Sequence, residues 1–418
     1  MAVNFFIILF RAIGGEEMKI LITTDTYSPI INGVVTSINN LYRELKCKGH
    51  EVKILTLSNT GDEKIDGDVY YLKSIKVGIY PDTRIINIIL QNGLIKKIIK
   101  WKPDVVHSQT EFSMMLVSKY ISRKLNIPHI HTYHTMYENY LNYLFKGKII
   151  NKNACAKITK ILLNSLDSII APTEKTRNTL VSYGVRKPIY VVPTGIDLGR
   201  FKQKLSLEEK QEILAKLNIS KKDRILAYIG RIGEEKNISE LIKLMPDIIK
   251  EIHNIKLLIV GGGPYLNNLK SLVKKDNIEE RVIFTGMINS EEIYKYYKIA
   301  EVFVTASFSE TQGLTYVEAL SSGCPVVCKY DSCIKGVIEQ GKNGFSYKEK
   351  DEFAHYIKRI LSDIKLREKM SKEAIITANK YSSGIFAKNI LDKYFYAINT
   401  NKENSIAFTK LVNPKPQK

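Results

Sequence analysis

The chain has few cysteines and no long apolar run. Only five cysteines occur in 418 residues, and an odd number in a chain of this length argues against a disulfide framework and for a reducing compartment. No segment approaches the roughly 20 consecutive apolar residues that a membrane-spanning helix needs. The sequence therefore excludes a small disulfide-stabilised fold and predicts no transmembrane helix.

Signals for a bound metal or dinucleotide are also missing. Cys324, Cys328 and Cys333 lack the spacing of a zinc site, so we interpret them as buried thiols beside a core strand. The Asp-Gly-Asp at 66–68 lies in a peripheral acidic hairpin rather than in a loop suited to a metal. The three glycines at 261–263 lack the G-x-G-x-x-G spacing of a dinucleotide site. We therefore expect no cofactor, and these residues do not imply dependence on a metal.

Positive charge, by contrast, is abundant. An apolar content of 44% and a charged content of 25% are ordinary for a soluble globular protein, and the length allows two or more domains. The net charge of +20 is not ordinary. It indicates an anionic partner, which is a nucleic acid, an anionic membrane surface or a phosphorylated substrate.

The first seventeen residues differ from the rest of the chain. Residues 1–10 are apolar, but they lack the basic region and the small-residue cleavage site of a signal peptide. A strand begins directly at Met18, and residues 14–17 can be encoded by purine-rich codons that resemble a bacterial ribosome-binding site. We expect translation to start at Met18 and residues 1–17 to be a non-native N-terminal extension.

Strands and helices alternate along the chain, which predicts an α/β fold with parallel sheets covered on both faces. One series occupies the first half, and a second begins at residue 224. The expected strands are 19–24, 51–57, 104–107, 129–133, 168–171 and 189–192, then 224–229, 256–260, 282–284, 302–305 and 325–328. Helices are expected between them, for example at 34–48, 112–125 and 174–183.

A polar segment rich in lysine and glutamate separates the two series. We place a linker at 196–222, between an N-terminal domain at 18–195 and a C-terminal domain at 223–380. A helix at 381–399 should follow, with packing back onto the first domain as one option, and 400–418 reads as a flexible tail. Two doubly wound domains facing each other would form a cleft lined by the carboxyl ends of both sheets.

The segment 309–325 carries two carboxylates around the start of a helix. Glu310 and Glu318 follow the apolar strand at 302–307, where ligands of open α/β sheets bind. Ser309 or Thr311 is expected to cap the helix, and the N–H groups of its first turn suit a phosphate. The two glutamates would meet opposite ends of an extended diphosphate ligand. Alternatively, both are solvated helix residues.

Four elements occur in order along the chain: Pro-Thr-Gly-Ile-Asp at 193–197, Gly-Arg-Ile-Gly-Glu-Glu-Lys-Asn at 230–237, Val-Gly-Gly-Gly-Pro at 260–264 and the segment with both glutamates. Together they resemble the retaining GT-B glycosyltransferases of family GT4. In the N-terminal half, residues 25–37 and His-Thr-Tyr-His-Thr-Met-Tyr-Glu at 131–138 are similar to the bacterial diacylglycerol glucosyltransferase branch. The resemblance implies two Rossmann-like domains, and transfer of glucose from UDP-glucose to 1,2-diacylglycerol with retention, in the cytoplasmic leaflet.

The resemblance also implies roles for residues on the donor side. It assigns Glu310 to sugar hydroxyls and Glu318 to the ribose. The backbone N–H groups that would bind the phosphates belong to Thr311, Gln312, Gly313 and Leu314.

Three further residues are expected to contact the diphosphate. Arg231 and Lys236 follow the first strand of the second domain, where two cations suit a leaving diphosphate; an ordinary basic turn is the alternative. Gly33 opens the first helix of the N-terminal domain and would let backbone approach the diphosphate. A plain helix start is the alternative for Gly33.

His134 is the best candidate on the acceptor side, because it follows a strand and the resemblance implies contact with the transferred sugar. A metal site with His129 and His131 is disfavoured, since strand alternation puts those two on the other face. A core histidine bonded to backbone is the further alternative. Asp25 and Glu138 are possible acceptor-side groups that would orient the acceptor hydroxyl.

Positive charge in the first domain concentrates in residues 84–160, which contain thirteen Lys or Arg against three acidic residues. The segment 84–102 is both apolar and basic and holds the only tryptophan. Basic amphipathic helices with Trp and Tyr lie in membrane interfaces. The alternative is a core-facing helix with a solvated basic face. Further aromatic and basic residues follow at Tyr137, Tyr140, Tyr143, Lys146, Lys148, Lys152, Lys157 and Lys160.

We therefore expect a peripheral glycosyltransferase on the cytoplasmic face of the plasma membrane, with a UDP-sugar donor and a lipid acceptor. No nucleic-acid motif is present, so a nucleic-acid partner is not expected. Within the same family, a glycolipid or a polysaccharide precursor is an alternative acceptor. A UDP-sugar 2-epimerase and a non-catalytic basic binding protein are alternatives from other classes.

Overall fold

The computed structural model describes residues 17–30, 32–77, 84–86, 92–136 and 152–412, with side chains up to residue 403. Two compact units make up the chain. Unit 1 contains Met1–Gly195 and Ser383–Lys418, and unit 2 contains Ile196–Ser382. The boundary after residue 195 coincides with the one expected from the sequence. The expected extension at 1–17 lies, apart from its last residue, outside the described residues.

Unit 1 is built on a sheet with the strand order β10-β9-β8-β7-β1-β2-β4-β3, in which every pairing is parallel except that of β3 with β4. β5 and β6 form a separate antiparallel pair. The strands are β1 (Lys19–Thr24), β2 (Glu51–Leu57), β3 (Lys64–Asp66), β4 (Val69–Leu72), β5 (Ser74–Lys76), β6 (Arg84–Ile86), β7 (Val105–Ser108), β8 (His129–Thr132), β9 (Ser168–Ala171) and β10 (Ile189–Val191).

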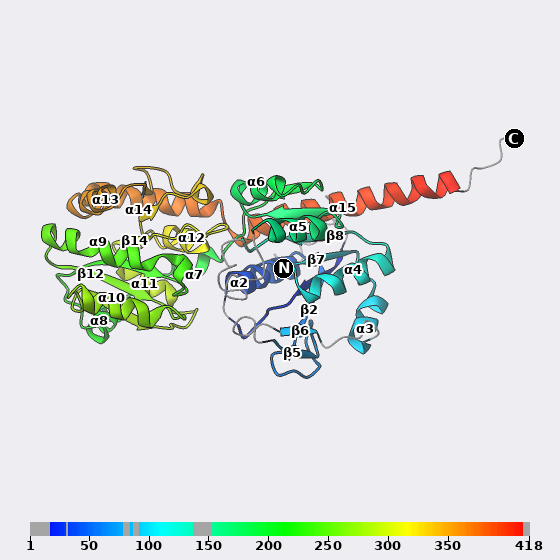
Figure 1. Cartoon of the computed structure of the whole chain (residues 1–418), viewed down its shortest axis with the longest axis horizontal. Coiled ribbons are helices and arrows are strands. Elements are labelled where there is room, and N and C mark those ends of the chain that lie inside the picture. Colours follow the sequence, from blue (N-terminus) through cyan, green and yellow to red (C-terminus); the bar gives the residue numbers. More distant parts are fainter. Residues whose placement is uncertain (1–16, 31, 78–83, 87–91, 137–151, 413–418) are drawn as a thin grey trace, which may run out of the picture. The chain divides into compact units, whose positions relative to one another are not determined.

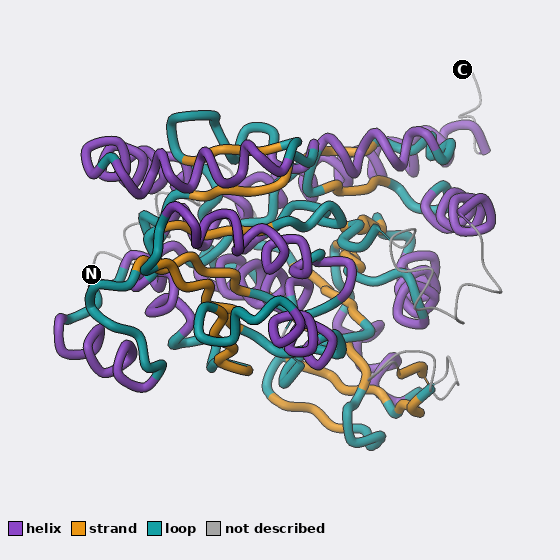
Figure 2. The backbone as a smooth tube through the Cα atoms, turned by 60° about the vertical axis from the view of Figure 1, so that its left-hand side comes forward, coloured by secondary structure: helices purple, strands orange, loops and turns teal. Residues whose placement is uncertain are grey.

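Helices cover both faces of this sheet (Figures 1 and 2). They are α2 (Gly33–Cys47), α3 (Gly93–Trp101), α4 (Ser113–Leu125), α5 (Lys152–Leu163), α6 (Glu174–Ser182) and α15 (Ser383–Val412). The alternation of β1 explains the two layers: Ile20 and Ile22 pack with α2 and α15, whereas Leu21 packs with α3 and α4. The near-continuous apolar strands are those of a parallel sheet buried on both faces.

Unit 2 has a six-stranded sheet, all parallel, with the order β13-β12-β11-β14-β15-β16. Numbered within the unit, this is the 3-2-1-4-5-6 order of a Rossmann fold. The strands are β11 (Arg224–Ile229), β12 (Ile255–Val260), β13 (Val282–Gly286), β14 (Val302–Thr305), β15 (Val326–Lys329) and β16 (Gly344–Tyr347). The sheet order reverses between β11 and β14.

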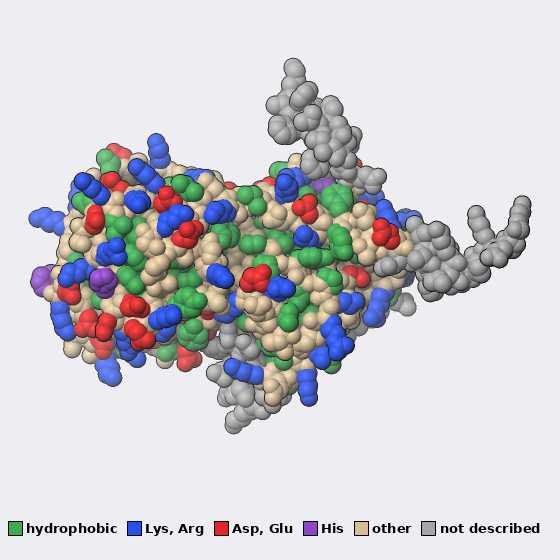
Figure 3. All heavy atoms as spheres, turned by 90° about the horizontal axis from the view of Figure 1, so that it is seen from above, with side chains coloured by type: hydrophobic (Ala, Val, Ile, Leu, Met, Phe, Trp, Pro, Cys, Tyr) green, Lys and Arg blue, Asp and Glu red, His purple; other side chains and the backbone are tan. Residues whose placement is uncertain are grey.

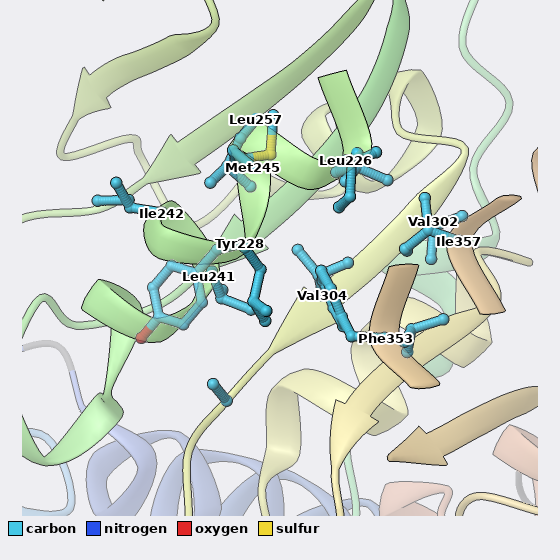
Figure 4. Packing of buried hydrophobic residues seen from close by; sticks show 14 of the residues in the cluster. Leu226, Tyr228, Leu241, Ile242, Met245, Leu257, Val302, Val304, Phe353 and Ile357 are labelled. Atoms are coloured by element: carbon cyan, nitrogen blue, oxygen red, sulfur yellow. The ribbon is translucent and has the colours of Figure 1, made fainter. Parts of the chain in front are cut away.

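The helices of unit 2 again lie on both sides of the sheet. They are α7 (Leu198–Lys202), α8 (Leu207–Lys216), α9 (Ile238–Glu251), α10 (Leu266–Lys275), α11 (Ile293–Ile299), α12 (Leu314–Ser321), α13 (Lys350–Ser362) and α14 (Ile364–Asn379). Figure 4 shows side chains of β11, β12 and β14 meeting those of α9 and α13 in one apolar core. Cys324, Cys328 and Cys333 are buried free thiols, as the sequence predicts.

The segment predicted as a linker is folded. Residues 196–222 contain α7 and α8 and belong to unit 2. Phe201, Leu214 and Ile219 are buried in its core. The prediction was wrong because it relied on the high content of lysine and glutamate. Phe201 on α7, Leu214 on α8 and Ile219 after α8 face the core and fix the segment to unit 2.

The C-terminal helix belongs to unit 1, where its apolar face packs with α2. We expected it to end at residue 399 and a flexible tail to follow, but α15 continues to Val412. No glycine or proline occurs between Ile385 and Val412. Because the chain contains no helix breaker there, the polar residues after 399 continue the helix rather than end it. Residues 413–418 lie outside the described residues.

The basic segment 84–102 is not one amphipathic membrane helix. It contains the strand β6 and the short helix α3, with 87–91 outside the described residues. Leu94, Ile95 and Ile98 of α3 are buried in the core of unit 1. The indole Nε1 of Trp101 donates to Glu51 Oε2 at 2.9 Å. The alternative interpretation, a core-facing helix with a solvated basic face, is therefore the one that holds for α3. In the described part of the chain, no helix is long and apolar enough to cross a bilayer.

Candidate active site

The expected donor-side residues gather where the sheet order of unit 2 reverses. Arg231 and Lys236 follow β11, and Glu310 follows β14, the strand beside it. In a doubly wound sheet the two neighbouring strands at this switch point send their loops to opposite sides, which opens a crevice for a ligand. The residues that the sequence suggested separately are thus brought to one end of one sheet.

Two ion pairs organise this end of unit 2. Nζ of Lys236 donates to Oε1 of Glu310 at 2.6 Å, and both side chains are largely buried. Ser307 Oγ donates to the same carboxylate oxygen at 2.9 Å. Arg231 pairs with Glu235, whose side chain is 4% exposed. Each cation therefore has a largely buried carboxylate partner that fixes it in place. We call Arg231, Glu235, Lys236, Ser307 and Glu310 the charged cluster.

Hydrogen bonds tie the two loops of the charged cluster together. Ser309 Oγ donates to the backbone oxygen of Glu235 at 3.1 Å, and Asn237 Nδ2 donates to that of Ala306 at 3.3 Å. Glu235 and Ser307 were not predicted from the sequence. Glu235 lies between two expected cations, and that position was the available signal: a carboxylate among ligand-binding cations commonly orients them.

The helix after Glu310 begins later than expected. α12 starts at Leu314 with Gly313 as its N-cap, and no side chain caps it, so neither Ser309 nor Thr311 has that role. Gly313 has φ 74°, and a Cβ there would lie 2.2 Å from the ring of Tyr316. Only glycine fits this turn. α12 follows β14 in the chain, so its first N–H groups lie beyond the carboxyl end of that strand.

Glu318 lies on α12 and is held by a tyrosine. The hydroxyl of Tyr297 donates to Glu318 Oε2 at 2.8 Å. Burial raises the pKa of Glu318, while the Tyr297 hydrogen bond and the charge of Arg200 act in the opposite direction. One carboxylate oxygen is thereby engaged by Tyr297, which fixes the orientation of the group that we expect to bind a ribose.

The glycine run after β12 serves backbone packing. A Cβ at Gly261 would lie 2.0 Å from the carbonyl oxygen of Gly230, and one at Gly263 would lie 2.3 Å from that of Ile232. The turns that follow β11 and β12 thus touch backbone to backbone. This contact keeps the Arg231 loop in place and gives the glycines a role other than that of a dinucleotide fingerprint.

In unit 1, polar residues follow three neighbouring strands at their carboxyl ends. Asp25 follows β1, Gln109 follows β7 and His134 lies two residues beyond β8. Gly33 is the first residue of α2 and is exposed, with Asn32 as N-cap accepting from Val35 N at 2.9 Å. Gln109 was missed from the sequence. Its place directly after a buried strand was the signal that could have identified it.

Asp25 is fully engaged within unit 1. Its Oδ2 accepts from Thr110 Oγ1 at 2.6 Å, and its Oδ1 accepts from Ser113 Oγ at 2.6 Å and from the N–H of Met114 at 3.0 Å. Burial raises its pKa, and these three donors lower it. The carboxylate holds the start of α4, because it accepts an N–H group of the first helical turn. This geometry favours a structural role over contact with an acceptor.

His134 is half-buried, and its Nε2 lies 2.8 Å from Oε1 of Gln109. Burial is the main reason why the pKa of His134 falls to about 3, and the neighbouring His131 adds to it. The imidazole is therefore neutral at physiological pH, which suits a group that handles uncharged hydroxyls.

The two histidines on β8 form a buried network with Ser108 and Glu111. Ser108 Oγ lies 2.8 Å from His129 Nε2 and 2.9 Å from His131 Nδ1, and His131 Nε2 lies 3.2 Å from Glu111. Among the described residues, no group of three or more His, Cys, Asp or Glu side chains is placed to hold a metal ion. His129 and His131 share the contact with Ser108, as their common strand face predicts, whereas His134 contacts Gln109 instead. Glu138 lies outside the described residues.

Comparisons with known proteins agree with both units. A family profile described as "Glycosyltransferase Family 4" matches residues 31–200, and one described as "Glycosyl transferases group 1" matches 209–376. The "Alpha-monoglucosyldiacylglycerol synthase" of Streptococcus pneumoniae is 36% identical over 388 residues, which cover 92% of this chain and 87% of the relative. That of Acholeplasma laidlawii is 30% identical over 400 residues, covering 92% and 99%.

Solved structures show the same architecture. Anabaena HepE in complex with UDP and glucose superposes with a TM-score of 0.72 at 16% identity, covering 90% of this chain and 99% of that one. The expected GT-B fold, with two Rossmann-like units, is confirmed. With a relative above 30% identity that spans nearly the whole chain, this protein belongs to glycosyltransferase family 4.

Proposed function

We propose that this glycosyltransferase moves glucose from UDP-glucose to the hydroxyl of 1,2-diacylglycerol with retention of configuration, on the cytoplasmic face of the plasma membrane. The observation that carries the proposal is the likeness, over more than nine-tenths of the chain, to two proteins named as monoglucosyldiacylglycerol synthases. The free thiols of all five cysteines support a reducing compartment.

The charged cluster supports a nucleoside diphosphate sugar as donor. Arg231 and Lys236 are positioned cations at the switch point of the sheet, as a diphosphate requires. Glu310, already fixed by Lys236 and Ser307, would accept hydrogen bonds from sugar hydroxyls. Structures with this fold that hold UDP and glucose support UDP as the nucleotide.

The proposed reaction is a front-side displacement. The bond between the sugar C1 and the β-phosphate oxygen breaks, and a bond from C1 to the acceptor oxygen forms on the same face. The leaving phosphate takes the proton of the acceptor hydroxyl, so neither a carboxylate nucleophile nor a metal ion is required. Arg231 and Lys236 would stabilise the charge that grows on the diphosphate. We accordingly propose no metal requirement, and full activity in EDTA is the expected result.

The decisive experiment is a panel of radiolabelled nucleotide sugars assayed with diacylglycerol in mixed micelles. UDP-glucose is expected to give a lipid-soluble product whose anomeric proton shows the α configuration by NMR. The Glu310→Ala variant is the control for activity from contaminants. If no sugar gives a product with diacylglycerol, but a glycolipid or a polysaccharide precursor is glycosylated, that molecule is the acceptor instead. Sugar conversion without an acceptor would indicate an epimerase.

Within the basic segment 84–160, membrane docking is better supported at a part other than α3. Since the apolar face of α3 is buried in the core, we propose the α4–α5 surface, defined by Phe112, Leu116, Ile158 and Ile161 with Lys157 and Lys160. The four apolar side chains are 49%, 59%, 50% and 72% exposed. Residues of α4 and α5 share one core cluster below, and Lys119 Nζ donates to Leu162 O at 3.3 Å, so the two helices are neighbours.

Exposed apolar residues flanked by lysines suit an anionic bilayer, where each cation adds about 1 kcal/mol. On the face shown in Figure 3, by contrast, basic side chains are interspersed with acidic and apolar ones, unlike the continuous basic track of a nucleic-acid site. Tyr137, Tyr140, Tyr143, Lys146 and Lys148, which the sequence also suggested for membrane contact, lie outside the described residues.

Vesicle sedimentation tests the α4–α5 surface. The double variant Ile158→Asp and Ile161→Asp is expected to lose most binding to vesicles containing anionic lipid. Charge reversal at Lys96, Lys97 and Lys100 on α3 is the matched comparison, and it should reduce binding less, because those side chains are exposed but stand on a core helix. Binding that depends on α3 and not on Ile158 and Ile161 would place the docking surface at α3 instead.

A further inference from the structure

Gln109 and His134 meet at the carboxyl edge of the unit 1 sheet. Gln109 directly follows β7 and His134 lies two residues beyond β8, and the two strands pair in parallel with Ser108 opposite His131. The N–H of Gln109 donates to Thr23 O of β1 at 2.9 Å. The backbone that carries Gln109 is therefore fixed by strands on both sides, and its side chain is 2% exposed.

The contact between the two side chains selects one form of the imidazole. Nε2 of His134 lies 2.8 Å from Oε1 of Gln109. An amide oxygen only accepts, so the ring must donate through an N–H at Nε2. In a neutral imidazole the other nitrogen, Nδ1, then carries the lone pair. Without the amide, either nitrogen could hold the proton.

The groups around His134 keep its ring neutral. Burial and the neighbouring His131 lower its pKa to about 3, and His107, on β7, is also close enough to interact with it. The carboxylates of this edge are engaged elsewhere: that of Glu111 faces His131 at 3.2 Å, and that of Asp25 accepts three hydrogen bonds. No hydrogen bond among the described residues joins His134 to either carboxylate.

The amide nitrogen of Gln109 is the second observation. It is buried and has no hydrogen-bond partner among the residues that the structure describes. Buried amide donors in native proteins nearly always have a partner. An unfilled donor beside His134 therefore marks a place where an oxygen of a ligand completes the network.

We propose that Gln109 is a positioning residue that holds His134 in its Nε2–H form, so that Nδ1 accepts a hydrogen bond from a substrate hydroxyl. The hydroxyl is either one of the transferred sugar or that of the acceptor, since both present the same O–H donor. The reaction that the pair serves rests on the proposed function, whereas the imidazole form can be observed without any substrate.

NMR of the protein with ¹⁵N-labelled histidine tests the form of the ring directly. At pH 7.5, the His134 signals, assigned by their loss in His134→Asn, are expected to show a protonated Nε2 and an unprotonated Nδ1. In Gln109→Leu the two forms should mix. A protonated Nδ1 in the wild type, or an unchanged spectrum in Gln109→Leu, would overturn the proposal whether or not the enzyme acts on diacylglycerol.

Kinetics with Gln109→Glu separate positioning from packing, because glutamate has the same shape and also accepts from Nε2–H. The new carboxylate should raise the pKa of His134, so that in mildly acidic solution Nδ1 gains a proton and no longer accepts. Activity of Gln109→Glu is expected to be close to that of the wild type at pH 8.5 and to fall as the pH is lowered to 5.5. A pH profile that superposes on that of the wild type would contradict the role.

Gln109→Leu gives the size of the effect. Its kcat is expected to fall up to about 100-fold, as misplaced catalytic groups do, at both ends of the pH range. If the Michaelis constant for the UDP-sugar changes together with kcat, the hydroxyl belongs to the sugar. If the Michaelis constant for the lipid changes, the hydroxyl belongs to the acceptor. Gln340→Glu is the matched control, because Gln340 bonds Ser346 in unit 2, and its pH profile should equal that of the wild type. Wild-type kcat in Gln109→Leu would refute the proposal.

Discussion

The two units place different chemistry at the carboxyl ends of similar sheets. In unit 2 the candidate residues are charged and paired, Lys236 with Glu310 and Arg231 with Glu235. In unit 1 they are neutral: His134 is kept uncharged by burial, and its partner is an amide. Both sets follow central strands of their sheets.

The difference matches two kinds of ligand. A diphosphate brings charge, so its cations need anionic partners that hold them in place until it binds. A hydroxyl brings no charge, so a neutral imidazole with a fixed proton is the better partner, and burial costs it little. The same doubly wound framework thus supports a charged cluster in one unit and neutral hydrogen-bonding groups in the other.

The largest expected effect comes from acid, which should act on unit 1 first. Burial lowers the pKa of His107, His129 and His134 in that unit. Above pH 6.5 these histidines are neutral in both states. As pH falls below 6.5, the unfolded chain gains protons that the folded unit does not, so the free energy of unfolding drops by about 1.4 kcal/mol per pH unit for each histidine.

Urea unfolding followed by the fluorescence of Trp101, the only tryptophan, reports unit 1. Its midpoint should move to lower urea between pH 7 and pH 5.5. For unit 2, whose two histidines at 253 and 355 are exposed, Phe284→Trp in a Trp101→Phe background serves as the matched reporter and should move less. Equal shifts in both reporters would remove the distinction between the units.

The next effect concerns the charged cluster. Glu310→Ala removes the partner of Lys236 and Ser307 together with the proposed contact to the sugar, and kcat should fall on the order of 100- to 1000-fold. Measurement of transfer at saturating UDP-glucose checks this, with liposome binding as the control that should not change. Transfer at the wild-type rate would show that Glu310 is misassigned.

A stability effect of intermediate size is expected at Gly313. In Gly313→Ala the added Cβ meets the Tyr316 ring, and the left-handed backbone alone costs about 1–3 kcal/mol in the free energy of unfolding. Gly341→Ala is matched, since it has φ 76° but the nearest side chain to its added Cβ, that of Phe345, is 3.8 Å away. Chemical denaturation should give a lower free energy of unfolding for Gly313→Ala than for Gly341→Ala. Equal losses of stability in the two variants would mean that the Tyr316 ring moves aside for the added methyl group.

The smallest effect is expected at Asp25. Asp25→Ala removes the acceptor at the start of α4 and should cost about 1 kcal/mol of stability, with kcat nearly unchanged at a temperature where the variant is folded. Ser206→Ala, which removes the side-chain cap of α8 in unit 2, is the comparison for a plain cap loss. A 100-fold loss of kcat without loss of stability would instead return Asp25 to the acceptor side.

Local pattern in the sequence was sufficient for much of this molecule. The strands at 19–24, 51–57, 168–171, 224–229 and 302–305 lie where apolar runs predicted them, because a buried parallel strand needs continuous apolar residues. The boundary after residue 195, the buried thiols and the family resemblance also follow from residues that are close in the chain. The charged cluster was foreseen in three of its members, Arg231, Lys236 and Glu310, although not in its pairing.

Only the tertiary structure decided the contacts between residues that are far apart in the chain. Ion pairing of Lys236 with Glu310 spans 74 positions, and the contact of Gln109 with His134 needs β7 and β8 side by side. The sequence suggested that the basic helix α3 contacts a membrane. In the structure Leu94, Ile95 and Ile98 are buried, so α3 packs its apolar face against the core of unit 1. Amphipathic spacing predicts that one face of a helix will be buried. Which surface buries it depends on packing between segments that are distant in the chain, and the local sequence does not contain this information.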